Sequence, residues 1–319
     1  MIVDLTATTA AEINVALTRA RHATGSPAVG MVLTLVIVTD ERHHYDAVKA
    51  ANEAAREHPS RILTVIARGG RGAPRLDAEV RVAGETGLGE NVLMRLHGEL
   101  APHADSVVTP LLLPDAPVVT WWPAHAPAVP AADPLGRLAQ RRITDAAAES
   151  RPLAALQARG AGYTPGDTDL AWTRATPWRT VLAAALDQPT DPVRAAEVGA
   201  ARGNPSAELL AAWLESRLGV SVARHVSRGP GVTSVRLVTR RGEIALVRPD
   251  GRLATLTRTG APDRTVALPR RPLSELVAEE LRRLDPDEVY AETLRHVAVP
   301  VEDRRPVPTA ARAGSSGTR

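Results

Sequence analysis

The sequence predicts an α/β protein, with an N-terminal, mostly parallel, Rossmann-like βα domain followed by a smaller α+β domain with antiparallel hairpins. Apolar, β-branched runs alternate with helix-like segments through the first 190 residues, and helical crossovers of this kind join parallel strands. Beyond residue 191 the pattern changes to short β segments separated by turn residues, among them Gly242 and Asp250–Gly251. Such turns are typical of hairpins.

The clearest βαβ unit lies at the centre of the first domain. Its two apolar runs, Asn91–His97 and Pro117–Trp122, are predicted strands, and the mixed segment Ala101–Leu113 between them has helix-like spacing. The unit ends in Trp121 and Trp122. Neighbours on a strand point to opposite faces, so only one of the two indoles needs to enter the core. The other is either covered by a second layer or presented to a partner.

The preceding segments add a further βαβ unit and two flanking elements. A helix is predicted over 9–21, because Thr9 and Glu12 have the spacing of a capping box. The apolar run Val32–Thr39 is a predicted buried strand. Three more elements follow: a helix at Tyr45–Glu57, a strand at Ile62–Ala67, and an alternating, half-exposed edge strand at Arg75–Val82.

The second half of the sequence supplies the domain limits. A strand is predicted at Arg141–Thr144, and helices at Pro152–Ala158 and within Asp169–Asp187. Pro189–Pro192 is the best candidate boundary, so we expect domains at 1–190 and 191–299 and a disordered tail at 300–319. The second domain is predicted to contain a helix after Asn204–Pro205, β segments at Val222–Val226, Val232–Thr239, Glu243–Val247 and Leu253–Arg258, and two closing helices that start near Leu273 and Asp285.

Composition limits the classes of function. Cysteine is absent, which rules out disulfides, thiol switching and thiolate ligands within this sequence. The net charge of +3 is too small to indicate nucleic acid, and the high pI reflects arginine, because Lys49 is the only lysine. No apolar run is long enough to span a membrane, and the N-terminal residues do not resemble an export signal. A cytoplasmic protein is expected.

Catalytic and ligand-binding motifs are not found. His43 and His44 lie near Asp40, but adjacent side chains rarely converge on one ion, so a solvated loop is favoured over a metal site. The glycines of 69–72 and 84–89 do not have the order of a dinucleotide fingerprint. Asp115 and Asp133 each lie beside a proline, where aspartate commonly makes turns. We therefore predict no catalytic, cofactor or metal residue.

Arginines line the C-terminal hairpins. They could bind RNA, but sheets that bind nucleic acid usually add stacking aromatic side chains, and none lies between Trp213 and Tyr290. A solvated face is the favoured interpretation. The arginines concerned are Arg236, Arg240, Arg241, Arg248, Arg252 and Arg258.

A second cluster combines tryptophan, arginine and aspartate. Together with Trp121 and Trp122 it contains four of the five tryptophans. One interpretation is the edge of a core, with each arginine paired to aspartate and packed on an indole. The other is a protein interface, because Trp and Arg dominate binding hot spots. Both stay open, and the candidate partner-binding residues are Trp121, Trp122, Asp169, Trp172, Arg174, Trp178 and Arg179.

Five segments resemble one known family, the glucose-6-phosphate dehydrogenase assembly proteins called OpcA, in their actinobacterial form. They are EHPSRI at 57–62, HADSVVTPLLLPDAPVVTWWP at 103–123, DPLGRLAQRRITDA at 133–146, GYTPGDTDLAWTRATPWR at 162–179 and RRLDPDEVYAETL at 282–294. The resemblance implies a non-enzymatic partner of glucose-6-phosphate dehydrogenase, without cofactor. Such a partner promotes the active oligomer of the enzyme in the oxidative pentose phosphate pathway. The thiol-based control found in photosynthetic relatives would have no cysteine here.

An alternative is a sensor or enzyme that binds a sugar phosphate or nucleotide. Its site would lie at the C-terminal ends of the parallel strands, where α/β folds place ligands. The loops at Asp40–His44 and Gly69–Gly72 are predicted to lie there.

Overall fold

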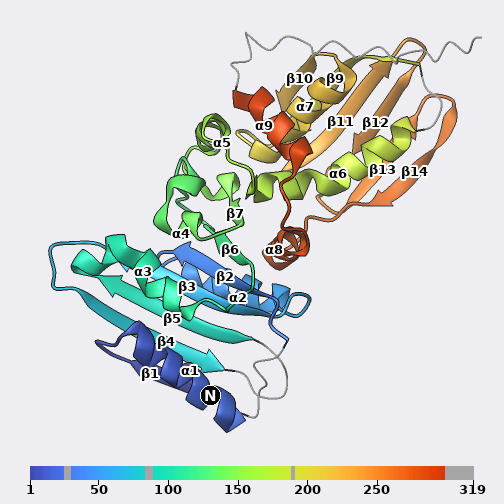
Figure 1. Cartoon of the computed structure of the whole chain (residues 1–319). Helices are drawn as coiled ribbons and strands as arrows, with labels where there is room; N and C mark the ends of the chain where they lie inside the picture. Colours follow the sequence, from blue (N-terminus) through green and yellow to red (C-terminus); the bar gives the residue numbers. More distant parts are fainter. Residues whose placement is uncertain (25–29, 83–88, 188–190, 299–319) are drawn as a thin grey trace, which may run out of the picture. The chain divides into compact units, whose positions relative to one another are not determined.

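The computed structural model describes residues 1–24, 30–82, 89–187 and 191–298 (Figure 1). The backbone divides into two units, each with its own sheet. Among the described residues, the first contains Met1–Arg174 and Arg271–Ala291, and the second contains Ala175–Arg270 and the residues from Glu292 to Ala298. No helix in the described part of the chain is both long and apolar enough to cross a membrane.

The first unit is built on an eight-stranded sheet. Six consecutive strands pair in parallel, and the two remaining strand pairings, at one side of the sheet, are antiparallel. The α/β, mostly parallel prediction is therefore confirmed. In sheet order the strands are β1 (Ile2–Leu5), β4 (Arg75–Val82), β5 (Glu90–His97), β3 (Ser60–Arg68), β2 (Leu33–Thr39), β6 (Val118–Trp121), β7 (Arg141–Thr144) and β8 (Asp167–Asp169).

This order contains the doubly wound Rossmann arrangement. The chain passes from β2 outward to β3 and β5, returns to β6 on the other side of β2, and continues outward to β7 and β8. The direction reverses between β2 and β6, which makes this the topological switch point of the sheet. Loops at the C-terminal ends of β2 and β6 are therefore neighbours.

The prediction that β4 is an edge strand is wrong. Its side chains do alternate between buried and exposed, but β1 pairs antiparallel along its outer side, with Val3 opposite Val80. β1 has only four residues, too few for its hydrophobic alternation to stand out in the sequence.

Helices cover both faces of this sheet. On one face, α1 (Ala10–Thr24) and α3 (Ala104–Val108) share a core with Val36 of β2. On the other, α2 (His44–Ala54) packs over Leu35 and Ile37. α1 begins with the predicted capping box, in which the amide of Glu12 donates to the Thr9 hydroxyl and the amide of Thr9 donates to the Glu12 carboxylate. Shorter helices complete the unit: η1 (Gly98–His103), η2 (Thr109–Leu111), η3 (Pro130–Ala132), α4 (Pro134–Arg137), η4 (Ala146–Ala148) and α5 (Pro152–Ala161).

Helix α8 (Leu273–Arg282) belongs to the first unit, although the sequence placed it in the second domain. Its residues Leu276, Val277 and Leu281 enter the same core as the alanine face of α2. The units therefore do not follow the expected limits of 1–190 and 191–299, because small α2 side chains let α8 pack closely. The predicted tail at 300–319 lies outside the described residues.

The second unit has a six-stranded sheet and its own core. The four predicted β segments are present with the expected bounds, whereas β9 and β14 were not predicted. β9 and β10 are parallel and the other pairs are antiparallel. In sheet order the strands are β10 (Val222–Val226), β9 (Val193–Ala200), β11 (Val232–Thr239), β12 (Glu243–Val247), β13 (Leu253–Arg258) and β14 (Ala261–Ala267).

Helices α7 (Pro205–Leu218) and α6 (Leu170–Leu186) supply the apolar residues that cover this sheet, including Leu210, Leu214 and Leu182. Asn204 caps α7, because its side-chain oxygen accepts the amide hydrogen of Ala207. α6 and α9 (Glu288–Ala298) each begin in the first unit and end in the second.

Candidate functional site

Trp121 and Trp122 are both buried, with 0% and 2% of their surface exposed. Trp121 enters the core between β2 and α2. Trp122 is covered by the segment around α4, because a Cβ added to Gly136 would lie 3.2 Å from its ring. Of the two alternatives drawn from the sequence, coverage by a second layer is the one observed.

Asp169 is the centre of a buried polar network at the end of β8. None of its surface is exposed. Its carboxylate accepts hydrogen bonds from the Arg159 guanidinium at 3.1 Å, the Thr144 hydroxyl at 2.6 Å and the amide of Ala146. Arg159 also pairs with Glu149. The network fixes the C-terminal ends of β7 and β8.

Trp172 and Arg174 pack inside the same unit. The indole N–H of Trp172 donates to Asp287 at 2.8 Å, and its ring lies 5.7 Å from that of Tyr290. Arg174 donates two hydrogen bonds to Asp145, each of 2.7 Å. Burial raises the pKa of Asp145, although the bonds from Arg174 oppose the shift. Arg174 keeps 30% of its side chain exposed.

Trp178 and Arg179 belong to the second unit. The Arg248 guanidinium lies over the Trp178 ring, 5.0 Å from its centroid, and both residues are buried. Arg248 donates to the carbonyls of Leu268 and Val232, so this member of the arginine set is a core residue. Arg179 is half-buried and donates to Thr176.

The candidate cluster is thus mainly a set of packed and paired side chains. Arg174 and Arg179 are its members with appreciable exposed surface. Contact with a partner through these residues stays a prediction. The buried tryptophans would contribute to it by supporting the surface rather than by touching a partner. Asp133, which the sequence placed beside a proline in a turn, caps α4 by accepting hydrogen bonds from the amides of Leu135 and Gly136.

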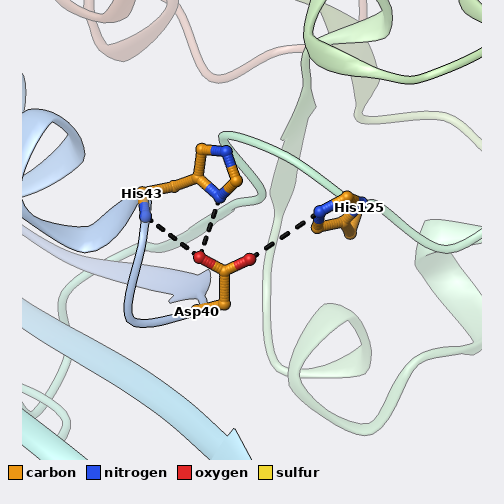
Figure 2. Close-up of side chains that lie close together, drawn as sticks. All are labelled: Asp40, His43 and His125. Atoms are coloured by element: carbon orange, nitrogen blue, oxygen red, sulfur yellow. Dashed lines mark hydrogen bonds and ion pairs between the residues drawn. The ribbon is translucent and has the colours of Figure 1, made fainter.

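The switch point holds a second group of polar side chains (Figure 2). Asp40 follows β2, His125 follows β6, and His43 precedes the first residue of α2. One oxygen of Asp40 accepts the amide hydrogens of Arg42 and His43 at 2.8 and 3.0 Å. Partial burial opposes ionisation, but these bonds and the His43 ring lower the pKa of Asp40. The carboxylate therefore stays charged at neutral pH.

The Asp40 carboxylate lies in the turn between β2 and α2, where dinucleotide-binding folds hold phosphate. In those folds a glycine-rich turn leaves the amides at the start of the helix free for the pyrophosphate. Here no glycine lies between Met31 and Arg68, and the negatively charged Asp40 accepts from two amides that immediately precede the first helical residue, His44. A phosphate would have to displace the Asp40 carboxylate from these amides and would then lie close to its negative charge.

The sequence did not reveal the role of His125, because 82 positions separate it from His43. His43 and His44 are adjacent in the sequence, but His44 does not join the group: its ring lies 3.0 Å from the Glu41 carbonyl. Only the sheet order brings the loops after β2 and β6 together.

A groove of about 450 Å³ lies beside α2. Its lining includes Tyr45, Lys49, Asn52 and Arg95. Tyr45 is 73% exposed, which is unusual for a side chain with so much apolar surface. It is an anchor candidate that the sequence did not single out, because one tyrosine on a helix gives no periodic signal.

The fold and this site define a class of protein that keeps the Rossmann strand order but replaces its phosphate-binding turn with a histidine-bearing loop whose amides bind an aspartate. Two family models match the chain. The "Glucose-6-phosphate dehydrogenase subunit N-terminal domain" matches residues 51–161, and the C-terminal domain of the same subunit matches residues 165–294. The chain belongs to this family, the OpcA-type glucose-6-phosphate dehydrogenase assembly proteins.

Solved structures with a similar backbone include oxidoreductases. A 3-ketoreductase from Actinomadura kijaniata, in complex with NADP and TDP-benzene, has a TM-score of 0.48 at 12% identity, covering 84% of this chain and 95% of its own. An oxidoreductase domain protein from Kribbella flavida has a TM-score of 0.48 at 9% identity, with the same coverage. A comparison with curated proteins finds no match.

Proposed function

We propose that this protein is a non-enzymatic activator and assembly factor that binds glucose-6-phosphate dehydrogenase and promotes its active oligomer. It would act in the cytoplasm, in the oxidative pentose phosphate pathway. The observation that carries the proposal is the pair of family matches, which together span most of residues 51–294.

The switch point supports a non-enzymatic role. Hydride transfer on this type of fold depends on a dinucleotide whose pyrophosphate lies at the helix N-terminus. Asp40 already accepts the amide hydrogens of Arg42 and His43 there. Its negative charge also repels phosphate.

Activation requires a difference in affinity. A partner shifts the dehydrogenase toward its active arrangement only if it binds that arrangement more tightly than the inactive one. A tenfold shift requires about 1.4 kcal/mol of differential affinity. One or two well-placed anchor side chains are sufficient to provide it.

Size-exclusion chromatography of this protein with its cognate dehydrogenase tests the proposal. Enzyme activity is read across the fractions. Co-elution in a larger oligomer, with raised activity or a lower KM, is expected at micromolar concentrations of both proteins. Separate elution with unchanged activity would contradict the proposal.

A second candidate function is a sensor of sugar phosphates. The groove beside α2 favours it, because Lys49, Arg56, Arg81 and Arg95 contribute to the lining. Thermal-shift measurements with glucose 6-phosphate, 6-phosphogluconate and NADP separate the two functions. An assembly factor without a ligand of its own shows no shift, whereas a sensor is stabilised increasingly, with the logarithm of ligand concentration, once that concentration exceeds Kd.

A further inference from the structure

Asp40, His43 and His125 form a compact group at the switch point of the first sheet (Figure 2). One potential ligand atom from each residue lies within 4.8 Å of those of the other two. We infer that these three side chains bind a divalent transition-metal ion such as Zn²⁺. Such a site is separate from the dehydrogenase-binding role, and either can exist without the other.

The donor set suits this class of ion. Imidazole nitrogens and a carboxylate oxygen are ligands for zinc and related metals, whereas calcium and magnesium prefer oxygen alone. Two histidines with one carboxylate leave a fourth position open for water or another ligand. The same three residues would form a poor anion site, because Asp40 is ionised.

The geometry is close to that required. A His43 ring nitrogen lies 2.8 Å from one oxygen of Asp40, and a His125 ring nitrogen lies 3.7 Å from the other. Ligand atoms around one tetrahedral zinc lie about 3.3 Å apart, given bonds of about 2.0 Å. Small rotations of partly exposed side chains would bring the nitrogens to this spacing. The two backbone amides that bind one oxygen of Asp40 fix the carboxylate in place.

A carboxylate also lies near the other ring nitrogen of His125. Glu149 is 4.0 Å from it, beyond hydrogen-bond distance, and is held in place by the amide of Ala126 at 3.0 Å and by Arg159. Carboxylates that hydrogen-bond to a metal-bound histidine orient the imidazole and select its tautomer, and a rotation of the exposed His125 ring would bring Glu149 into this role.

The turn between β2 and α2 does not alone account for the group. The bonds from Asp40 to the backbone amides of Arg42 and His43 close that turn and need no imidazole. His125 comes from a different loop and has a φ of 53°, a left-handed conformation that is uncommon for residues other than glycine. Its ring nevertheless lies against Asp40.

Titration of the untagged, full-length, metal-free protein with Co²⁺ tests the inference. We expect one equivalent to bind, with visible d–d absorption bands that disappear when Zn²⁺ is added. Isothermal titration with Zn²⁺ alone provides the affinity. Absence of a stoichiometric complex would overturn the inference.

Three variants assign the site. His125→Gly removes a ligand at a position where glycine accepts the positive φ, and Asp40→Asn keeps an oxygen that can accept from the amides of Arg42 and His43 while removing the charge. His44→Ala is the matched control, because this neighbouring histidine lies outside the group. We expect at least tenfold weaker binding for the first two and unchanged binding for the control. Equal binding by His125→Gly, Asp40→Asn and the unmodified protein would place the metal elsewhere and overturn the inference.

Discussion

At the scale of single residues, most buried charges in the described part of the chain are paired with an opposite charge, and the pairs predict large effects of substitution. Asp169 is fully buried and balances Arg159. Asp169→Asn leaves Arg159 with only Glu149 as a charged partner, so we expect the free energy of unfolding to fall by about 3 kcal/mol. Urea denaturation measures this. The control is Arg241→Ala, which removes an exposed pair with Asp191 and should leave the unfolding midpoint unchanged. Equal effects of the two substitutions would contradict the prediction.

Glu215 makes stability dependent on pH. Burial acts to raise the pKa of Glu215, but hydrogen bonds from Arg224 and His296 lower it overall. A carboxyl whose pKa is depressed by folding stabilises the protein above its unfolded pKa of about 4.3 and loses that contribution as pH falls through the lower folded value. Glu215→Gln should therefore cost about 1 kcal/mol at pH 7 and progressively less below pH 4. Denaturation of both proteins at several pH values tests this, and a difference independent of pH would oppose it.

At the scale of helices and strands, the sequence was informative where one element carries its own signal. The capping box at Thr9 and Glu12 and the apolar run of β2 are local features, and the structure has both. β9 and β14 show little apolar alternation. Most side chains of β14 and several of β9 are exposed. These strands are held by pairing with their neighbours, which a single segment does not reveal.

Helix α8 shows the same limit, because its apolar face was recognised but its packing partner was not. Leu276→Ala removes a side chain with 1% exposure, and we expect it to destabilise the first unit by about 2–4 kcal/mol. Hydrogen exchange should show the loss of protection in α2, which shares this core, while β11 and β12 stay protected. The partly buried Leu273 provides the control through Leu273→Ala. Loss of protection in β11 instead of α2 would contradict this assignment.

At the scale of the whole molecule, what the sequence left open was strand order. The mostly parallel first sheet could be predicted from βα alternation, but the switch point follows from pairings between distant strands, such as β2 with β6. His125 joins Asp40 only through that pairing. The four candidate tryptophans show the opposite limit. Their residue type suggested a binding hot spot, but all four are buried in the folded chain. Residue type alone does not distinguish a core anchor from an interface anchor.

Activation and folding stability should therefore respond to different residues. Trp121→Ala removes a fully buried indole and should cost about 3–5 kcal/mol of folding free energy. Its loss of dehydrogenase activation should then match the fraction of unfolded protein. Tyr45 is 73% exposed beside the α2 groove. Tyr45→Ala should keep the unfolding temperature and weaken binding of the dehydrogenase about tenfold, equivalent to about 1.4 kcal/mol.

Binding titrations and thermal unfolding of the same samples separate the two effects. Val226→Ala, on a residue of the second unit that is 60% exposed, is the control for loss of apolar surface in general. Full activation by Tyr45→Ala, together with lost activation by a Trp121 variant that remains folded, would contradict the prediction that Tyr45 binds the dehydrogenase and Trp121 only stabilises the fold. It would mean that the partner reaches the indole only after the first unit opens, because the side chain has no exposed surface in the folded chain.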